Sequence, residues 1–334
     1  MTVTGGPPLA LTMGEPSGIG GELSLKAWLA RRDRIPPFFV LDRPERLSTL
    51  AERLGLAVPV TPIETPQAAA AIFADALPVL PLQAPVAAEA GRPDPANAPA
   101  VLEAIERAVA LSMAGDAAAV VTNPIQKSSL YEAGFRHPGH TEFLADCCGV
   151  AQSWMMLVSP ELKAVPVTIH QALREAIDSL SREAVVAAAE AAGTVLKQRF
   201  GLAAPRLAIS GLNPHAGENG ALGSEDQAIV APAVADLQAR GWQARGPLPA
   251  DTMFHAAARA SYDAAICMYH DQALIPVKAL AFDDGVNVTL GLPIVRTSPD
   301  HGTALDIAGS GRASEASLLS ALDLAAEMTR PRPA

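Results

Sequence analysis

Residues 264–272 read AAICMYHDQ, an apolar run from Ala264 to Met268 that is followed almost at once by His270. A short run of this kind, with no polar position, is typical of a strand buried on both faces of a sheet. Ligands of open α/β sheets bind beyond the carboxyl ends of the strands. The sequence therefore places His270 where chemistry is expected.

Two other histidines repeat the arrangement. His170 follows the apolar residues 165–169, and His215 follows the apolar residues 207–212. These spacings are too long for a zinc-finger staple, but a catalytic metal takes its ligands from separate strand ends. Imidazole nitrogens suit Zn²⁺, Co²⁺ or Fe²⁺ and do not suit Ca²⁺. The pattern fits either a metal centre or three unrelated polar residues, and the nearby carboxylates are either further ligands or ordinary loop residues: Asp271, Asp283 and Asp284.

The composition narrows the class of protein. The chain has 334 residues, 49% of them hydrophobic and 4% aromatic, which is enough for two domains of ordinary size. A net charge of -10 argues against nucleic acid or an anionic membrane as the partner, because those partners require basic faces. The three cysteines do not have the spacing of a disulfide framework. The sequence also shows no secretory signal pattern and no long apolar run, and we therefore expect a cytoplasmic protein.

Strand and helix patterns alternate along the chain, which predicts an α/β protein with a parallel or mixed sheet and helices on both faces. We expect strands at residues 9–12, 38–41, 117–121, 155–158, 163–169, 206–210 and 264–268. Helices are expected at residues 22–30, 44–54, 98–114, 143–148, 182–200, 224–240 and 314–328. Residues 77–99 are rich in Pro and Ala and are interpreted as a long surface connection, and residues 246–252 as a turn.

Three further patterns each have two interpretations. The Gly-rich segment 13–22 suits an anion at a helix N-terminus or simply a tight turn, and it is neither the dinucleotide nor the phosphate-loop fingerprint. Thr141 is the expected N-cap of the helix at 143–148, so His140 lies either in an anion-binding loop or in an ordinary surface turn. A cluster of cationic and polar residues either binds an anionic group or is solvated: Lys278, Arg296, Arg312, Asn287 and Thr303.

Taken together, long motifs in a fixed order resemble the PdxA family of 4-hydroxythreonine-4-phosphate dehydrogenases over nearly the whole chain. The resemblance is carried by residues 14–20 (GEPSGIG), 139–142 (GHTE), 211–218 (GLNPHAGE), 249–252 (PADT), 269–272 (YHDQ) and 284–291 (DGVNVTLG). The chain departs from the usual family pattern at Glu15, Ser17, Gly21 and Asn123.

The resemblance implies two α/β domains around a cleft, in the isocitrate/isopropylmalate dehydrogenase-like fold. Residues 1–128 with about 275–334 would form the first domain and carry the cofactor loop. Residues from about 129 to 274 would form the second, with the metal and dimer contacts.

The same resemblance implies roles for individual residues. His170, His215 and His270 would bind a divalent metal (Zn, Mg or Co), with His270 reaching across from the other subunit of a homodimer. Lys278 and His270 are the implied catalytic residues, and the implied substrate contacts are His140, Thr141, Lys278, Asn287 and Arg296. The segment 300–309 is similar to an adenosine-binding loop, so the implied cofactor contacts are Gly14, Gly18, His301, Gly302, Thr303 and Asp306. A ribose hydroxyl on Asp306 would favour NAD over NADP.

The implied reaction oxidises 4-phosphooxy-L-threonine to 2-amino-3-oxo-4-phosphooxybutanoate, which decarboxylates to 3-amino-2-oxopropyl phosphate in pyridoxal 5′-phosphate biosynthesis. A divalent cation lowers the pKa of the alcohol, and the proton passes to Lys278 or to a water molecule. The alternatives are a related dehydrogenase for another phosphorylated hydroxy acid, such as 4-phosphoerythronate, or for an aromatic dihydrodiol, a metal-dependent lyase, and a non-catalytic metabolite-binding protein.

Overall fold

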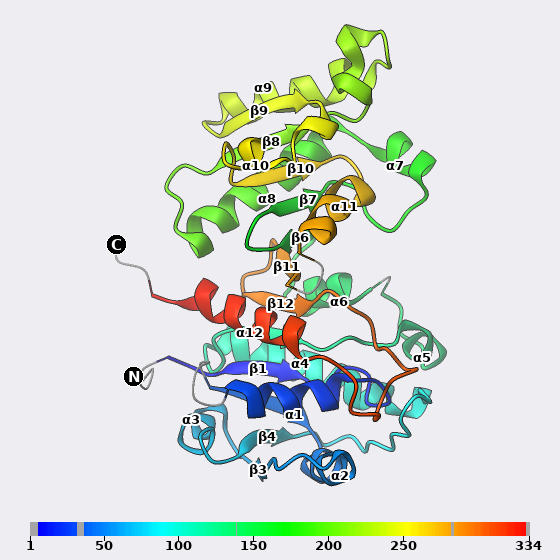
Figure 1. Cartoon of the computed structure of the whole chain (residues 1–334), viewed down its shortest axis with the longest axis vertical. Coiled ribbons are helices and arrows are strands. Elements are labelled where there is room, and N and C mark those ends of the chain that lie inside the picture. The colour runs from blue at the N-terminus through cyan, green and yellow to red at the C-terminus, as the bar shows by residue number, and fades with distance from the viewer. Residues whose placement is uncertain (1–5, 32–36, 138, 282–283, 332–334) are drawn as a thin grey trace. The chain divides into compact units, whose positions relative to one another are not determined.

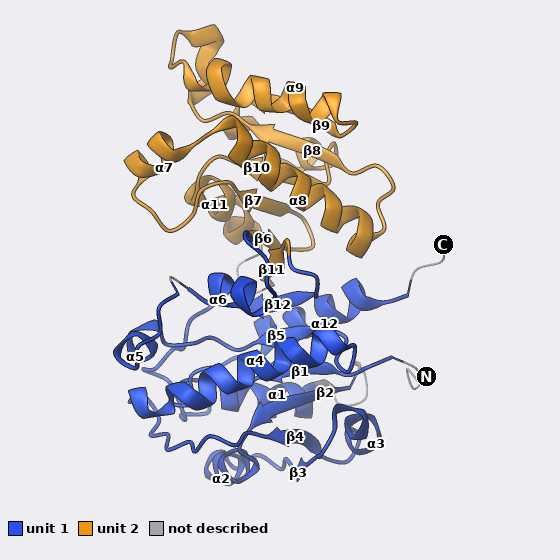
Figure 2. Ribbon diagram, turned by 180° about the vertical axis from the view of Figure 1, so that it is seen from behind, with its two compact units in different colours: residues 1–153, 292–331 blue, residues 154–291, 332–334 orange. Residues whose placement is uncertain are grey.

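The computed structural model describes residues 6–31, 37–137, 139–281 and 284–331. The chain forms two compact units, one of residues 1–153 with 292–331 and one of residues 154–291 (Figure 2). Unit 1 is thus built from two separate parts of the chain. Both divisions fall later in the sequence than the positions near 128 and 274 that were expected.

Unit 1 is an α/β layer structure whose strands follow the order β3-β4-β2-β1-β5-β12, with parallel pairing throughout. Helix α4 covers one face of this sheet, and α1 and α12 cover the other (Figures 1 and 2). Its elements are β1 (Leu9–Thr12), α1 (Gly20–Arg31), β2 (Phe38–Asp42), α2 (Pro44–Leu54), β3 (Val60–Pro62), α3 (Ala69–Ile72), β4 (Leu77–Pro81), α4 (Ala98–Ala114), β5 (Val120–Thr122), α5 (Lys127–Glu132), α6 (His140–Cys147), β12 (Arg296–Pro299) and α12 (Ala316–Thr329).

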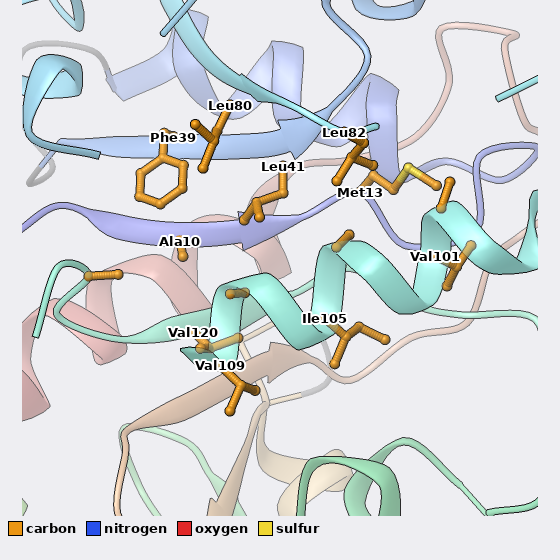
Figure 3. Close-up of a cluster of buried hydrophobic side chains, with 14 of the residues drawn as sticks. Ala10, Met13, Phe39, Leu41, Leu80, Leu82, Val101, Ile105, Val109 and Val120 are labelled. Atoms are coloured by element: carbon orange, nitrogen blue, oxygen red, sulfur yellow. The ribbon is translucent and has the colours of Figure 1, made fainter. Parts of the chain in front are cut away.

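The core of unit 1 lies between α4 and the sheet (Figure 3). Val101, Ile105 and Val109 recur every four residues and so share one face of α4. They pack in one cluster with Phe39 and Leu41 of β2. Each such side chain stabilises the fold by roughly 1.5–3 kcal/mol when fully buried. This packing fixes the carboxyl ends of β1, which leads into the Gly-rich turn at residues 13–22, and of β5, which ends at Thr122.

Unit 2 has a mixed sheet of order β11-β6-β7-β10-β8-β9. β6 pairs antiparallel with β11 and β7, whereas β7, β10, β8 and β9 run parallel. Helices α8 and α11 lie on opposite faces (Figures 1 and 2). The elements are β6 (Trp154–Val158), β7 (Lys163–Pro166), α7 (Leu173–Ser179), α8 (Arg182–Phe200), β8 (Arg206–Ser210), η3 (Pro214–Gly220), η4 (Asp226–Val230), α9 (Ala231–Ala239), β9 (Gln243–Leu248), α10 (Ala256–Arg259), β10 (Ala264–Cys267), α11 (His270–Leu280) and β11 (Val286–Leu290).

The α/β class and the mixed sheet with helices on both faces are confirmed, and α2, α8, β1 and β8 have the expected bounds. Three local predictions were wrong. Residues 77–99 begin with the buried strand β4, because Pro78 lies between Leu77, whose amide donates to the Pro59 carbonyl, and Val79, whose carbonyl accepts from the Ile63 amide. Residues 246–248 belong to β9. Helix α6 begins at His140 and its N-cap is Gly139, so Thr141 is inside the first turn. By contrast, the expected helix 224–240 is present, and it starts with the π turn η4 before α9, which has Pro232 near its start.

Within the described residues, no helix has the length and apolarity that a bilayer span requires.

Candidate active site

Three adjacent parallel strands of unit 2 end in the segments that carry the three histidines. β10 pairs with β7 on one side and with β8 on the other. His170 follows β7 by four residues, His215 lies in η3 just after β8, and His270 is the first residue of α11 after β10. Because the carboxyl ends of parallel strands share one edge, the topology brings all three segments to the same edge of the sheet.

A chain of buried hydrogen bonds ties these three strand ends together. The Thr168 hydroxyl donates to the Met268 carbonyl at 2.9 Å, which joins the ends of β7 and β10. The buried Gln272 side chain accepts from the Met268 amide at 2.7 Å and donates to the Gly211 carbonyl at 2.8 Å, which joins β10 to β8. Amide and hydroxyl groups satisfied in this way hold their segments in one arrangement. Gln272 and Thr168 therefore position the histidine-bearing loops.

The loop that carries His215 has an unusual left-handed backbone. Residues 215–219 all have positive φ, and four of them are not glycine. The buried Asp226 carboxylate holds this path, because it accepts hydrogen bonds from the Leu212 amide at 2.7 Å and from the Asn213 amide at 3.0 Å. His170 also has a positive φ, of 50°. Backbone strain of this kind persists where the surroundings impose it and concentrates at functional sites.

His170 and His270 line one cavity of about 500 Å³. Their ring centroids lie 5.8 Å apart, and His270 Nδ1 lies 2.7 Å from the Asp271 carboxylate. Such a carboxylate partner orients an imidazole and leaves its other nitrogen for a ligand. Glu175 of α7 lines the same cavity.

The donor chemistry of this edge suits a divalent transition metal, since the imidazoles come from separate strand ends. Among the described residues of this single chain, no three His, Cys, Asp or Glu side chains are grouped closely enough to hold a metal ion. His215 is not among the residues that line the cavity of His170 and His270. Asp284 is exposed, and Asp283 lies outside the described residues.

In unit 1, the buried Arg296 and the half-buried His140 form a polar centre. Arg296, at the start of β12, is 3% exposed, and its Nη2 donates to the Thr122 hydroxyl at 2.6 Å. The same nitrogen lies 3.5 Å from His140 Nδ1. Burial lowers the pKa of Arg296 to about 10, so the guanidinium keeps its charge at neutral pH. A buried cation held by a strand-end hydroxyl is suited to an anionic ligand.

His140 is neutral at this centre. Burial lowers the pKa of its imidazole well below the ordinary value, and the charges of Arg296 and Lys127 lower it further. Because Arg296 presents an N–H to Nδ1, that nitrogen is the acceptor and Nε2 carries the proton. Nε2 is shielded from solvent, and no group among the described residues is within hydrogen-bond distance of it. His140 thus offers a donor that a bound ligand would satisfy.

The lowered pKa of His140 predicts how stability depends on pH. The unfolded chain protonates this histidine near pH 6.5 and the folded chain only at lower pH, so the unfolded state binds more protons in between. The free energy of unfolding of the wild type should therefore fall as pH drops below about 6.5, by at most about 1.4 kcal/mol per pH unit from this group. Urea unfolding between pH 7 and 5 should show a shallower fall for His140→Gln. An unchanged slope would contradict the buried neutral histidine.

The other predicted substrate contacts are placed in both units. Thr141 follows His140 in the first turn of α6, in unit 1. Lys278 is a half-buried residue of α11, and Asn287 lies on β11 with its Oδ1 shielded and without a hydrogen-bond partner among the described residues. Arg312 is exposed.

The predicted cofactor residues all lie in unit 1. The Ile19 amide donates to the Thr303 carbonyl at 3.1 Å, and the Thr303 hydroxyl donates to Gln126 at 3.1 Å. A Cβ on Gly18 would be 2.8 Å from the Thr303 carbonyl oxygen, and one on Gly14 would be 2.6 Å from that of Pro124. These two glycines are thus required by the packing of the turn itself.

The loop beyond the turn has the features that would suit a nucleotide. Gly302 and Asp306 are exposed, and His301 Nε2 is shielded and without a hydrogen-bond partner among the described residues. A ligand on this loop would meet a carboxylate acceptor and an unsatisfied imidazole nitrogen, which fit ribose hydroxyls and phosphate oxygens. The cysteines do not compete as reactive groups, because burial, with a smaller effect of Glu106, raises the pKa of Cys147 to about 11.

Sequence patterns did not reveal three residues that organise the candidate site: Gln272, Asp226 and Thr122. Gln272 follows the predicted strand 264–268 by four residues, and Thr122 directly follows the predicted strand 117–121. Each residue therefore lay where ligand-binding residues are expected, although no motif singled it out. Asp226 had no comparable signal, because its partners are backbone amides of a loop more than ten residues away.

The family model for the pyridoxal phosphate biosynthetic protein PdxA matches residues 35–325. A curated 4-hydroxythreonine-4-phosphate dehydrogenase of Bradyrhizobium diazoefficiens is 56% identical over 334 residues, which cover 96% of each chain. One of Methylorubrum populi is 57% identical over 335 residues, covering 98% of this chain and 95% of the relative.

Solved structures agree with these relatives. The 4-hydroxythreonine-4-phosphate dehydrogenase of Klebsiella pneumoniae superposes with a TM-score of 0.87 at 35% identity, covering 97% of this chain and 100% of the other. A terephthalate 1,2-cis-dihydrodiol dehydrogenase of Burkholderia xenovorans superposes less closely, with a TM-score of 0.67 at 28% identity and coverage of 97% and 98%. The expected isocitrate/isopropylmalate dehydrogenase-like fold is confirmed, and a dehydrogenase family implies a nicotinamide cofactor. The chain therefore belongs to the PdxA family of pyridoxal phosphate biosynthesis, whose members are the oxidoreductases named 4-hydroxythreonine-4-phosphate dehydrogenase.

Proposed function

We propose that the chain catalyses the NAD-dependent and divalent-metal-dependent oxidation of 4-phosphooxy-L-threonine to 2-amino-3-oxo-4-phosphooxybutanoate, which decarboxylates to 3-amino-2-oxopropyl phosphate. The observation that carries this proposal is the placement of His170, His215 and His270 at the ends of three adjacent parallel strands, where imidazoles would hold a metal. The metal, when bound, supplies the positive charge that lowers the pKa of an alcohol and stabilises an enolate.

The chain's own residues bind and orient the substrate. Arg296 and the Nε2–H of His140, with Thr141 beside it, would bind an anionic end by charge-assisted hydrogen bonds. Lys278 and Asn287 would bind the remaining polar groups, and Lys278 is the candidate acceptor of the hydroxyl proton. The adenosine end of the cofactor would be held by His301, Gly302, Thr303 and Asp306. The nicotinamide carries the hydride, and the protein orients the cofactor and the substrate for its transfer.

The test is an NAD⁺-reduction assay with 4-phosphooxy-L-threonine, with and without a chelator. We expect turnover that stops on chelation and returns when Zn²⁺, Co²⁺ or Mg²⁺ is added. The dihydrodiol dehydrogenase among the structural neighbours makes a related dehydrogenase the second candidate. Faster turnover of 4-phosphoerythronate or of a cis-dihydrodiol than of 4-phosphooxy-L-threonine would establish that candidate instead.

We further propose a homodimer with shared active sites, in which His270 completes the metal site of the partner. Exposed apolar side chains support this, because Leu173, which lines the cavity of His170, is 57% exposed, Ile177 of the same helix α7 is 37% exposed, and Ile275 of α11 is 65% exposed. Apolar side chains gathered beside a polar cavity are typical of an interface.

Mixed dimers provide the test. His170→Ala and His270→Ala homodimers should each be inactive, but random mixing makes half the dimers hybrid, and each hybrid has one site in which both histidines are intact. The mixture should therefore regain about a quarter of the wild-type activity. A mixture as inactive as its components, with hybrid dimers verified by mass spectrometry, would show that each site lies within one subunit.

A further inference from the structure

The walls of the cavity that His170 and His270 line carry negative charge. Two carboxylates, Glu175 and Asp271, line it as well, and no lysine or arginine among the described residues does. Such walls repel the phosphate and the carboxylate of a substrate and attract a cationic group. The cavity is therefore suited to a positively charged part of the substrate.

The two carboxylates differ in how far the protein already uses them. Asp271 Oδ1 lies 2.7 Å from His270 Nδ1, so this carboxylate orients the imidazole. Glu175 Oε2 accepts a hydrogen bond from the Ala172 amide at 3.2 Å, whereas its Oε1 accepts none from any described residue. No described cation forms an ion pair with Glu175. This side chain thus keeps one oxygen and its charge for a ligand.

Glu175 is held in place by helix α7. It lies in the first turn of the helix, and its neighbour Ala176 is 5% exposed and packs into the unit. The Gln171 side chain donates to the Ser179 hydroxyl at 2.8 Å, which ties the loop before α7 to the end of the helix. A segment that is fixed at both ends therefore presents the carboxylate to the cavity.

The proposed substrate has a cation that must come to this cavity. Its amino group is on the carbon next to the alcohol that is oxidised, and bond lengths place the nitrogen roughly 3–4 Å from the alcohol oxygen. An α-amino group is largely protonated at neutral pH. Because the proposed reaction places the alcohol beside His170 and His270, the ammonium group falls within the same cavity, of about 500 Å³.

Resting on the proposed function of this site, we infer that Glu175 binds the α-ammonium group of the amino-acid substrate by a charge-assisted hydrogen bond. Glu175 then determines the preference of the chain for a 2-amino substrate over a hydroxy acid with a hydroxyl at the same carbon. A hydroxyl carries no charge, so it gains less from the carboxylate.

The experiment compares 4-phosphooxy-L-threonine with its 2-hydroxy analogue, 2,3-dihydroxy-4-phosphooxybutanoate of the same configuration. Calorimetry of the metal-loaded, full-length protein without NAD⁺ measures the Kd of each compound, and steady-state kinetics measure KM. Glu175→Gln should weaken binding of the amino compound at least tenfold and change binding of the hydroxy analogue less than twofold. Glutamine keeps an acceptor for the Ala172 amide and loses only the charge.

A matched control comes from the same helix. Asp178→Asn neutralises an exposed carboxylate of α7 that does not line the cavity, and it should change neither affinity. Bound metal, measured by mass spectrometry, should be unchanged in both variants.

The outcomes separate this inference from the proposed function. A Glu175→Gln protein that binds both compounds as the wild type does, or that binds both equally less tightly, would overturn the role of Glu175 and leave the dehydrogenase proposal intact. Loss of bound metal in this variant would also overturn that role, because Glu175 would then be a metal ligand. A wild type that binds neither compound and reduces NAD⁺ with neither would overturn both proposals.

Discussion

His215→Ala is expected to remove the bound metal and to lower kcat/KM by about 10³-fold or more. Replacing residues that only orient metal ligands already costs about 10- to 100-fold, so the loss of a ligand should cost more. The fold should persist, because the His215 side chain is exposed and forms no hydrogen bond with any described residue. Mass spectrometry measures the bound metal, steady-state kinetics measure kcat/KM, and the thermal midpoint of unfolding shows whether the fold persists.

Two variants control for other causes. His255→Ala removes an exposed histidine of the same unit that caps α10, and it should leave metal content and activity unchanged. His215→Asn keeps a residue that tolerates the left-handed backbone and removes the imidazole, so it should be as inactive as the alanine variant. Wild-type activity in either His215 variant would show that His215 is not a ligand.

Arg296→Met is expected to lower kcat/KM for the phosphorylated substrate by about 10²- to 10⁴-fold, mainly through KM. A hydrogen bond to a charged group contributes roughly 1.5–3 kcal/mol, and a guanidinium makes two with one anion. Methionine has a similar length and removes a buried charge, so a large loss of stability is not expected. Calorimetry measures the loss of substrate affinity, and urea unfolding measures any loss of stability, so the two effects can be told apart.

Thr122→Val is the matched control, since it removes the hydroxyl that holds the Arg296 guanidinium and keeps the charge. It should cost about tenfold, because a hydrogen bond of a charged group contributes roughly 1.5 kcal/mol at the lower end of its range and each 1.4 kcal/mol is about tenfold. An Arg296→Met enzyme within threefold of the wild type would place the anionic end of the substrate elsewhere.

The sequence predicted those parts of the fold in which local pattern and tertiary packing agree. α8 and β8 have strong helical or apolar patterns and clear ends, and both were found with the expected bounds. α11 was not predicted, because Pro276 interrupts its helical pattern. In addition, its first turn, at His270, comes directly after the predicted strand 264–268, so these polar residues were interpreted as the end of that strand. β11 and β12 were missed for a related reason: their short runs, such as VNVTL, resemble loop segments until neighbouring strands complete the ladder.

The candidate site was predicted in part. The sequence placed His170, His215 and His270 at strand ends, and the order β7-β10-β8 explains why such separated residues share one edge. It could not predict the left-handed backbone at His170 and His215 or the Asp226 bonds that hold it, since these depend on contacts distant in sequence. His140 was expected in a loop, but it starts α6, where Arg296 of β12 reaches it.

The central claim is that three imidazoles from separate strands hold one divalent cation, and X-ray absorption spectroscopy of the zinc-loaded protein tests it most directly. The claim predicts one zinc per chain with three imidazole nitrogens at about 2.0–2.1 Å, falling to two in His215→Asn. A zinc environment with fewer than three imidazoles in the wild type, or one that is unchanged in His215→Asn, would contradict it.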